Sequence, residues 1–259
     1  MESELLANEI SALKAAMRGS AKLEATYALG RIASSIVDEE FQVLAGNARL
    51  YRGEFVKFDA ERFVSALKAN GITSHAIELL GSDLKTLIRD HGIDLDSAKM
   101  EEIARYHQIG ATKTIWKGGK AHCITITPFV SLSSSIDTAL RSAVNLVEMK
   151  TGVEIGMYTE EDGSYNSLFL QKIKSRLSEG YSPLVYIIDA PKALILELSA
   201  ASSMKFDELG NYIIKNSANE YGEDEYLAAI IPPEIIRGFM VFTGNPYEPG
   251  ESYWRFSTL

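Results

Sequence analysis

The stretch "KAHCITITPFVSLSSS" (residues 120–135) marks a change of pattern along the chain. Upstream of it, apolar residues recur at helical spacing, as Ile10, Leu13 and Met17 do. Within it, β-branched residues alternate with polar ones, which is typical of a β-strand. The change predicts an α+β protein, in which an α-helical N-terminal part is joined to a C-terminal part that mixes strands and helices.

The segments on either side fit this division. Before residue 111 the pattern predicts a short strand at "RLYRG" (49–53) and helices at 1–46, 59–71, 73–92 and 96–110. In the helix at 59–71, Asp59 is the expected N-cap and Gly71 the expected end. After residue 111 we expect helices at 134–152 and 167–180 and strands within 120–135, 182–200 and 226–244. The stretch "FDELGNYIIKNS" (206–217) is typical of a short helix or loop.

Length, charge and cysteine content restrict the class of protein. The chain of 259 residues suits one large domain or two small ones. Its net charge of −9 argues against a surface that binds nucleic acid or anionic lipid throughout. The single cysteine, Cys123, excludes an internal disulfide and fits a reducing compartment. Residues 1–19 lack a basic start and an unbroken apolar core, so no secretory signal is expected. The sequence contains no run of about 18 apolar residues, so no membrane-spanning helix is expected.

Three short motifs lie far apart in the sequence. "LYRGE" (50–54) places Arg52 in a short strand, and "TPFVSLSSSIDTA" (127–139) ends a strand in serines. "GEDEYLAAIIPPEIIRGF" (222–239) puts acidic residues directly before a strand. Each motif alone has an ordinary interpretation: a surface arginine, a cap formed by Ser134 or Ser135 for the next helix, and a solvated acidic turn. Their occurrence together, each beside an expected strand, favours a functional site.

In this order the motifs resemble those of the R-S-E class of mono-ADP-ribosyltransferases, the cholera toxin and pierisin-like group. The matching residues are Arg52, the triplet 131–133 ("SLS") and the triplet 223–225 ("EDE"). The stretches "LVYIIDAP" (184–191) and "IPPEIIRGF" (231–239) also resemble strands of that family. The resemblance covers residues 48–60 and 120–245, and it departs at Leu132, where the family has threonine.

The resemblance implies a fold, a reaction and a cosubstrate. The fold is a split β-sandwich in a catalytic domain at 47–259, with a helical insertion at 60–110 and a separate helical region at 1–46. The reaction transfers ADP-ribose from NAD to a target protein and releases nicotinamide, and it needs no metal. The Glu-x-Glu spacing implies that the acceptor is arginine.

The resemblance also implies roles for the acidic motif. Glu225 is the carboxylate that stabilises the oxocarbenium ion through the ribose 2′-hydroxyl. Glu223 orients the acceptor and takes its proton, and residues i and i+2 of an extended segment do face the same way. Tyr221 is the loop aromatic that packs against the acceptor protein, and Gly222 lets the loop turn.

The other matching residues are expected to hold NAD. Arg52, with Gly53 beside it, offers a planar fork suited to phosphate or ribose oxygens. Ser131 is expected to hydrogen-bond Glu225 and to hold its rotamer. Ser133 is expected to support the serine strand.

Other functions stay open beside the transferase. An NAD glycohydrolase uses water as the acceptor, and modification of a nucleic-acid base is disfavoured by the net charge of −9. A non-catalytic interaction module would use the helices to bind a partner. The transferase itself implies a target protein that carries the acceptor residue. An injected bacterial effector or toxin would meet it in the host cytoplasm, and a phage protein in the bacterial cytoplasm. No membrane span is expected, and nucleic acid is a disfavoured partner.

Histidines and lysines give weaker signals. None of the four histidines, His107 among them, has the spacing of metal ligands, so no metal site is expected. His122 and Cys123 lie within an expected strand and are interpreted as packing residues. The lysines around Trp116 either flank a solvated hairpin turn or contact an acidic partner or nucleic acid; they are Lys113, Lys117 and Lys120.

Overall fold

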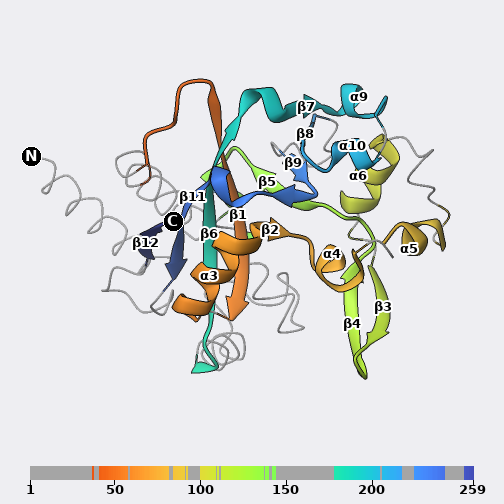
Figure 1. Cartoon of the computed structure of the whole chain (residues 1–259), viewed down its shortest axis with the longest axis horizontal. Coiled ribbons are helices and arrows are strands. Elements are labelled where there is room, and N and C mark those ends of the chain that lie inside the picture. The colour runs from red at the N-terminus through yellow and green to blue at the C-terminus, as the bar shows by residue number, and fades with distance from the viewer. Residues whose placement is uncertain are drawn as a thin grey trace, which may run out of the picture.

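Eight strands pair into one large sheet, in the order β12-β11-β6-β1-β5-β9-β8-β7 (Figure 1). Neighbouring strands run antiparallel except β7 and β8, which are parallel. The large, mostly antiparallel sheet agrees with the predicted α+β class. The strands are β1 (Asn47–Lys57), β5 (Val130–Ser133), β6 (Tyr181–Pro191), β7 (Ile195–Glu197), β8 (Ile213–Asn216), β9 (Glu225–Ala228), β11 (Ile236–Phe242) and β12 (Trp254–Thr258).

The structure is a computed structural model, and parts of the chain lie outside its description. The helical region predicted at 1–46 lies outside the description at 1–36 and 38–40, and its described residues 41–46 form a bend and a turn, not a helix. Residues 144–152 and 167–177 of two further predicted helices also lie outside it, as do Tyr221, Gly222 and Glu223 of the acidic motif. The described residues are 37, 41–57, 59–81, 84–90, 92, 100–108, 110, 112–136, 138–139, 142–143, 178–204, 206–217, 225–242 and 254–259.

The large sheet consists of two halves that meet at β1 and β5. The long strands β12, β11, β6 and β1 form one half, and the short strands β5, β9, β8 and β7 form the other. β1 pairs with β6 along its whole length, but its register with β5 rests on the pair Tyr51↔Ser133. In Figure 1, β1 and β6 run nearly upright whereas β5 and β9 run nearly across, so the two halves cross steeply.

Helices and two small sheets cover the large sheet. The small sheets pair β2 (Ile72–Thr73) with β10 (Ile230–Ile231), and β3 (Thr112–Lys117) with β4 (Lys120–Thr125). Among the helices that the structure describes, none is long and apolar enough to cross a membrane. The helices are α3 (Ala60–Asn70), α4 (His75–Leu80), α5 (Leu84–Asp90), α6 (Met100–Gln108), α9 (Leu198–Ala201) and α10 (Phe206–Leu209), with the 3-10 turns η3 (Lys192–Leu194) and η4 (Pro233–Ile235).

Buried apolar clusters lie on both faces of the sheet. Helices α4, α6 and α9 pack against the short strands, where Ile103 and Leu227 are buried together. Helix α3 packs against one face of the long strands, around Leu50. On the opposite face of the long strands, Ile136, Ala139 and Ala143 are buried with Val185. Because β6 is covered on both faces, its run at residues 184–188 ("LVYII") is continuously apolar rather than alternating.

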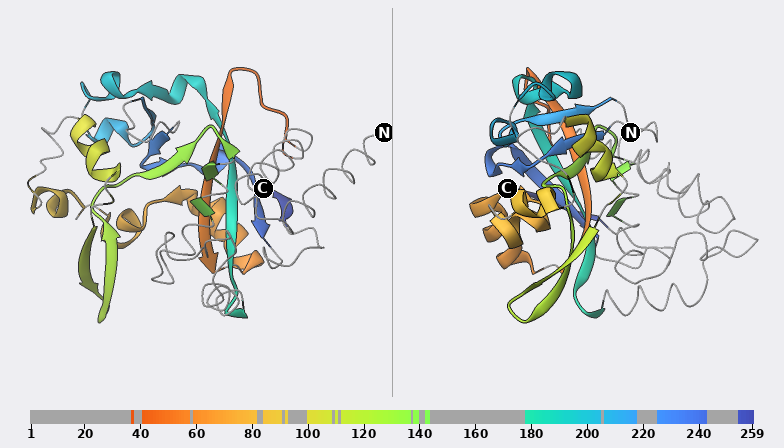
Figure 2. Two further views of the ribbon diagram at one scale, coloured as in Figure 1. Left: turned by 180° about the vertical axis from the view of Figure 1, so that it is seen from behind. Right: turned by 90° about the vertical axis from the view of Figure 1, so that its right-hand side faces the viewer.

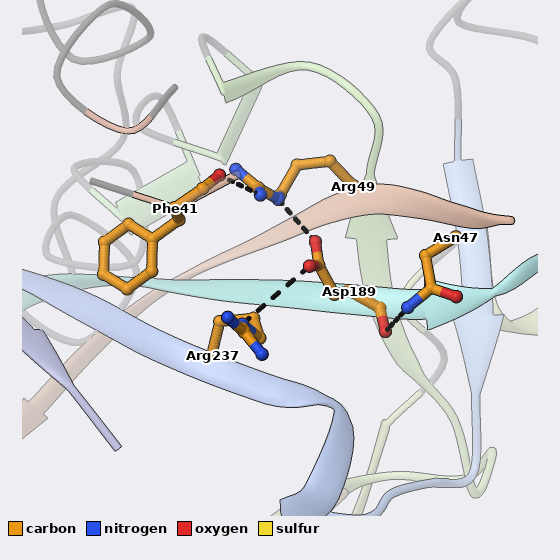
Figure 3. A network of polar contacts seen from close by, with 5 residues as sticks. All are labelled: Phe41, Asn47, Arg49, Asp189 and Arg237. Carbon is orange, nitrogen blue, oxygen red and sulfur yellow. Dashed lines mark hydrogen bonds and ion pairs between the residues drawn. The ribbon is translucent and has the colours of Figure 1, made fainter. Parts of the chain in front are cut away.

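A buried carboxylate near the end of β6 links it to the neighbouring long strands (Figure 3). Asp189 on β6 is 2% exposed, and its Oδ1 accepts a hydrogen bond of 2.7 Å from Nε of Arg49 on β1. On β11, Nε of Arg237 lies 3.9 Å from Oδ2 of Asp189. Arg49 also donates to the carbonyl oxygen of Phe41, and Asn47 donates to the main-chain oxygen of Asp189 at 3.2 Å. Three strands and the segment before β1 are therefore joined through one charged group.

The helix predictions hold where capping residues set the ends. Helix α3 begins after Asp59, whose side chain accepts an N–H of the first turn at 3.3 Å, and it ends at Gly71. The stretch 73–92 is divided into α4 and α5 and is not one helix. The reason is Gly81, whose φ of 54° is accessible to glycine and whose N–H closes α4 by bonding to Ile77.

Three strand predictions are corrected by long-range pairing. β1 is longer than the predicted 49–53 because β6 pairs with all of it. The stretch 206–217 contains α10 and then a strand, β8, which is held between β7 and β9. The stretch 120–135 is two strands, β4 and β5, with a break at 126–129. In each case the partner strand decides the conformation, and local pattern alone is a weak guide to it.

Candidate active site

Three of the predicted site residues lie on neighbouring strands of the sheet. Arg52 is on β1, Ser131 is on β5 and Glu225 is the first residue of β9, and β5 lies between the other two strands. The site is therefore at the line where the two halves of the sheet meet. The motifs are brought together although residues 52 and 225 are far apart in the chain.

The Glu225 carboxylate is held by donors from three elements. Ser131 on β5 donates its hydroxyl to Oε1 at 3.1 Å. Asn216 on β8 donates Nδ2 to Oε2 at 2.8 Å, and it is also the register partner of Glu225. Gln108, at the end of α6, donates Nε2 to the same oxygen at 3.5 Å. The half-buried carboxylate is thus fixed in one orientation, as a group that must face a developing charge needs to be.

His107 lies between two hydroxyl groups. Its Nε2 is 2.8 Å from Oγ of Ser131, and its Nδ1 is 2.6 Å from Oγ1 of Thr127. With an ionised Glu225, the hydroxyl hydrogen of Ser131 goes to the carboxylate, so Ser131 can only accept from the ring. His107 therefore carries its proton on Nε2, and Thr127 donates to Nδ1. Three hydrogen bonds in series then point from Thr127 towards Glu225.

Burial keeps this histidine neutral. Desolvation, and next the positive charge of Arg52, lower the pKa of His107 from 6.5 to about 4. A neutral ring has one donor and one acceptor, and this is what the two hydroxyl contacts require. The electrostatics and the hydrogen bonds therefore agree on the state of His107 at neutral pH.

Arg52 reaches the cluster through the main chain of Ser131. Its Nη1 donates to the carbonyl oxygen of Ser131 at 3.0 Å, and its Nε lies 3.9 Å from Oε2 of Glu54. Tyr186 donates its hydroxyl to that same Oε2 at 3.2 Å, and burial, followed by the charge of Glu54, raises the pKa of Tyr186 well above 10.0. Nε of Arg52 is buried without a hydrogen-bond partner in the described residues. Ser131 thus connects Arg52 with Glu225.

Ser133 and Gly53 lie beside the cluster and have local structural contacts. The Ser133 hydroxyl accepts from the N–H of Ser135 at 3.0 Å, and the Ser135 hydroxyl accepts from the N–H of Thr138 at 3.3 Å. The predicted serine cap is therefore Ser135. A Cβ on Gly53 would meet the carbonyl oxygen of Ala139 at 1.8 Å, so glycine allows the segment 136–143 to pack on β1. Their predicted roles in binding NAD stay predictions.

Sequence reasoning missed His107, Asn216 and Gln108. A signal for Asn216 existed, because the segments 213–216 and 225–228 lie close together in the sequence, and pairing them places Asn216 opposite Glu225. It was hidden by the interpretation of 206–217 as a helix or loop. His107 and Gln108 end a helix whose sequence carries no mark of its distant partners. Tyr221 and Glu223 fall outside the described residues, so their positions are not given.

Two other features of the described residues lie apart from this cluster. A hollow of about 580 Å³ lies near α3, η4 and the paired strands β11 and β12, where Phe41, Lys68 and Arg237 are among its lining residues. None of the residues around Glu225 lines it. No group of three or more histidine, cysteine or acidic residues in the described ranges is placed to hold a metal ion.

A scan of the chain against models of protein families finds no match, and a search of curated proteins finds no match either. The function is therefore argued from the site itself.

Proposed function

We propose that the chain is a mono-ADP-ribosyltransferase of the R-S-E class, which transfers ADP-ribose from NAD to an arginine of a target protein. The observation that carries the proposal is the connection from Arg52 through Ser131 to Glu225 across three neighbouring strands. The arginine, serine and glutamate of three distant motifs thus lie together, and the serine hydroxyl donates a hydrogen bond to the carboxylate.

The proposed transfer of ADP-ribose requires groups that the cluster contains. When the bond between C1′ of the ribose and nicotinamide breaks, nicotinamide leaves with the bonding electrons and the ribose becomes cationic. A carboxylate held by Ser131, Asn216 and Gln108 can stabilise that charge through the ribose 2′-hydroxyl. The guanidinium of Arg52 is of a kind that suits the phosphate oxygens of NAD.

The architecture also supports the proposal. The long and short halves of the sheet cross where β1 meets β5, as a split β-sandwich would require. Residues 60–108 hold the helices α3 to α6 between β1 and the β3–β4 pair, where the helical insertion is proposed. The boundary at 46/47 remains a proposal.

An NAD glycohydrolase is the second candidate. The groups that would break the glycosidic bond are the same in both reactions. With water as the acceptor, nicotinamide and free ADP-ribose would be released.

Labelled NAD separates the two candidates. The wild-type chain, Glu225→Gln and the control Glu61→Gln, on the exposed side of α3, are each incubated with labelled NAD and a bacterial or eukaryotic lysate. We expect a labelled protein band with the wild type and the control and none with Glu225→Gln. NAD consumed without labelled protein would favour the glycohydrolase. A folded wild type that neither consumes NAD nor labels protein contradicts both candidates.

A further inference from the structure

A two-stranded hairpin stands apart from the large sheet. β3 and β4 pair only with each other among the described strands, through a turn at Gly118 and Gly119, which have φ of 60° and 75°. In Figures 1 and 2 the hairpin extends away from the body of the molecule in each view. After β4 the chain continues through Thr127 into β5, which carries Ser131. The hairpin is therefore joined directly to the proposed active site.

The hairpin has one buried and one open face. Ile115 and His122 are register partners on the inner face, where Ile115 packs against the core and Ile124 is buried. Alternate residues lie on the outer face, and Trp116 is paired there with Ala121. The outer face consists of the exposed residues Thr112, Thr114, Trp116, Ala121 and Cys123.

The outer face of the hairpin is apolar at its tip and has no charge. Trp116 is 78% exposed, against 52% for Leu44, the next most exposed large apolar side chain of the described residues. Tryptophan has a large apolar area and is enriched among the residues that dominate protein–protein interfaces. A face of threonine, alanine and cysteine around it offers little to bind phosphates, and it resembles the uncharged centre of a protein interface.

The tip of the hairpin is positive, and its lysines alternate onto the face opposite Trp116, where Ile115 and His122 lie. Residues 112–125 contain Lys113, Lys117 and Lys120 and no acidic residue, although the net charge of the chain is −9. Lys117 and Lys120 are paired directly across the turn and are both exposed. Lys117 also donates to the carbonyl oxygen of Leu79 on α4, the helix that lies beside β4. The local charge complements an acidic partner, and the rest of the chain would repel one.

We propose that this outer face and the lysines at its tip dock the acceptor protein, and that they recognise an acidic surface with an exposed apolar side chain. The inference rests on the proposed transferase function and adds the class of partner. Thr127 and Phe129, between the hairpin and β5, both contact His107. The chain therefore runs from the base of the hairpin, through two residues that contact His107, into the strand that carries Ser131.

Binding is tested first, because it needs no enzymatic activity. The chain has two tryptophans, so Trp254→Phe leaves Trp116 as the only tryptophan reporter. The probes are a peptide with one arginine among glutamates and leucines, the same peptide with lysines for the glutamates, and a single-stranded oligonucleotide. We expect the acidic peptide to change Trp116 fluorescence saturably and to bind at least 10-fold more tightly than either other probe. Equal or tighter binding of the lysine peptide or the oligonucleotide would overturn the proposal.

Activity then separates docking from catalysis. In Trp116→Ala and in Lys117→Glu/Lys120→Glu, we expect KM for the acidic peptide to rise at least 10-fold, with NAD hydrolysis in the absence of peptide unchanged. Leu44→Ala, which removes an exposed apolar side chain elsewhere, serves as the matched control. An unchanged KM in Trp116→Ala would refute the docking role.

A covalent label answers the question without a substitution. Cys123 is the single cysteine of the chain and lies exposed on the outer face, so a bulky maleimide attached there covers that face. We expect modification of the peptide to fall at least 10-fold while NAD hydrolysis persists, and labelling without effect would count against the proposal. If NAD is not cleaved at all, the transferase function fails, and the fluorescence titration still decides whether the hairpin docks an acidic partner.

Discussion

At the scale of single residues, the candidate site converges on Ser131. Its hydroxyl donates to Glu225 and accepts from His107, and its carbonyl oxygen accepts from Arg52. Substitution of the side chain removes the first two contacts and leaves the third, which belongs to the main chain. The role of the hydroxyl can therefore be tested without disturbing Arg52.

We predict that Ser131→Ala lowers kcat for NAD cleavage by about 100-fold, as removal of one well-placed donor from a polar site commonly does, with little change in KM. The reason is that Glu225 loses the donor that holds Oε1. Steady-state kinetics of NAD hydrolysis measures the effect. Ser133→Ala, on the same strand, is the control and should retain most of the kcat. Equal rates for wild type and Ser131→Ala would show that the hydroxyl has no part in the reaction.

His107 predicts a dependence of stability on pH. Its pKa is 6.5 when unfolded and about 4 when folded, so below pH 6.5 the unfolded chain takes up a proton that the folded chain excludes. The free energy of unfolding should fall as the pH drops from 6.5 to 4, by up to about 3 kcal/mol at ~1.4 kcal/mol per pKa unit, and His107 adds no further loss below pH 4. Urea unfolding of wild type and His107→Gln at pH 7, 5.5 and 4 gives this difference. Parallel pH profiles for the two proteins would rule out the histidine as its source.

The sequence predicts those site residues that sit in a local motif. Arg52, Ser131 and Glu225 were found because each lies beside a recognisable strand. His107 could not be found in this way, since its partners Thr127 and Ser131 are 20 and 24 positions away and on other elements. A buried polar contact is a property of two distant segments, and no local pattern records it.

At the scale of elements, close packing of the segment 136–143 on β1 depends on Gly53. A Cβ there would lie 1.8 Å from the carbonyl oxygen of Ala139 and 2.6 Å from the amide nitrogen of Ala143. Both obstacles are main-chain atoms, which a rotamer change cannot move. Gly53 was predicted from its motif as a residue near NAD, and its packing role could not be predicted because the covering segment is far away in the sequence.

We predict that Gly53→Ala destabilises the protein by several kcal/mol, at the upper end of the ~1–3 kcal/mol that overpacking a core usually costs. Urea unfolding followed by circular dichroism measures the change. The control is Gly118→Ala in the hairpin turn, where a Cβ meets no atom within 4 Å and φ is 60°. That change should cost only the backbone strain of about 1–2 kcal/mol. Equal losses for the two variants would mean that Gly53 matters through its conformation and not through packing.

The elements themselves were predicted unevenly. Helix α3 was predicted with its ends because Asp59 and Gly71 make local contacts that the sequence displays. Strand β8 was not, because its four residues become a strand only by lying between β7 and β9. Short segments with two partners are decided by the sheet around them.

At the scale of the whole molecule, Asp189 joins the long strands. Asp189 is 2% exposed and accepts a hydrogen bond from Arg49 on β1 (Figure 3). Arg237 on β11 lies farther from its carboxylate, at 3.9 Å. A buried charge is tolerated only when an opposite charge is paired with it. Removal of one partner leaves the other as an unpaired buried charge, which lowers the free energy of unfolding. The network therefore ties the integrity of the sheet to one ion pair.

We predict that Asp189→Asn lowers the free energy of unfolding by about 3–5 kcal/mol, because the Arg49 charge is left buried and unpaired. Arg49→Met combined with Asp189→Asn should regain at least half of this loss. Arg237→Gln should have a small effect, since the Arg237 side chain is 40% exposed. A double-mutant cycle in urea measures the coupling of Arg49 and Asp189. If the double variant is as unstable as the sum of the single ones, the two charges are not coupled.

The place of β1 in the centre of the sheet has a consequence for synthesis on the ribosome. β1 ends at Lys57, whereas β5 begins at Val130 and β6 at Tyr181. At about 5–20 residues per second, roughly ten seconds pass before β6 is made. Until then Phe55, which is fully buried in the folded chain, has no strand beside it, and we expect chaperones to cover this segment. Crosslinking to ribosome-bound chains arrested before residue 181 would show this. Because Glu225 emerges later still, the candidate site is assembled only after β6 has been made.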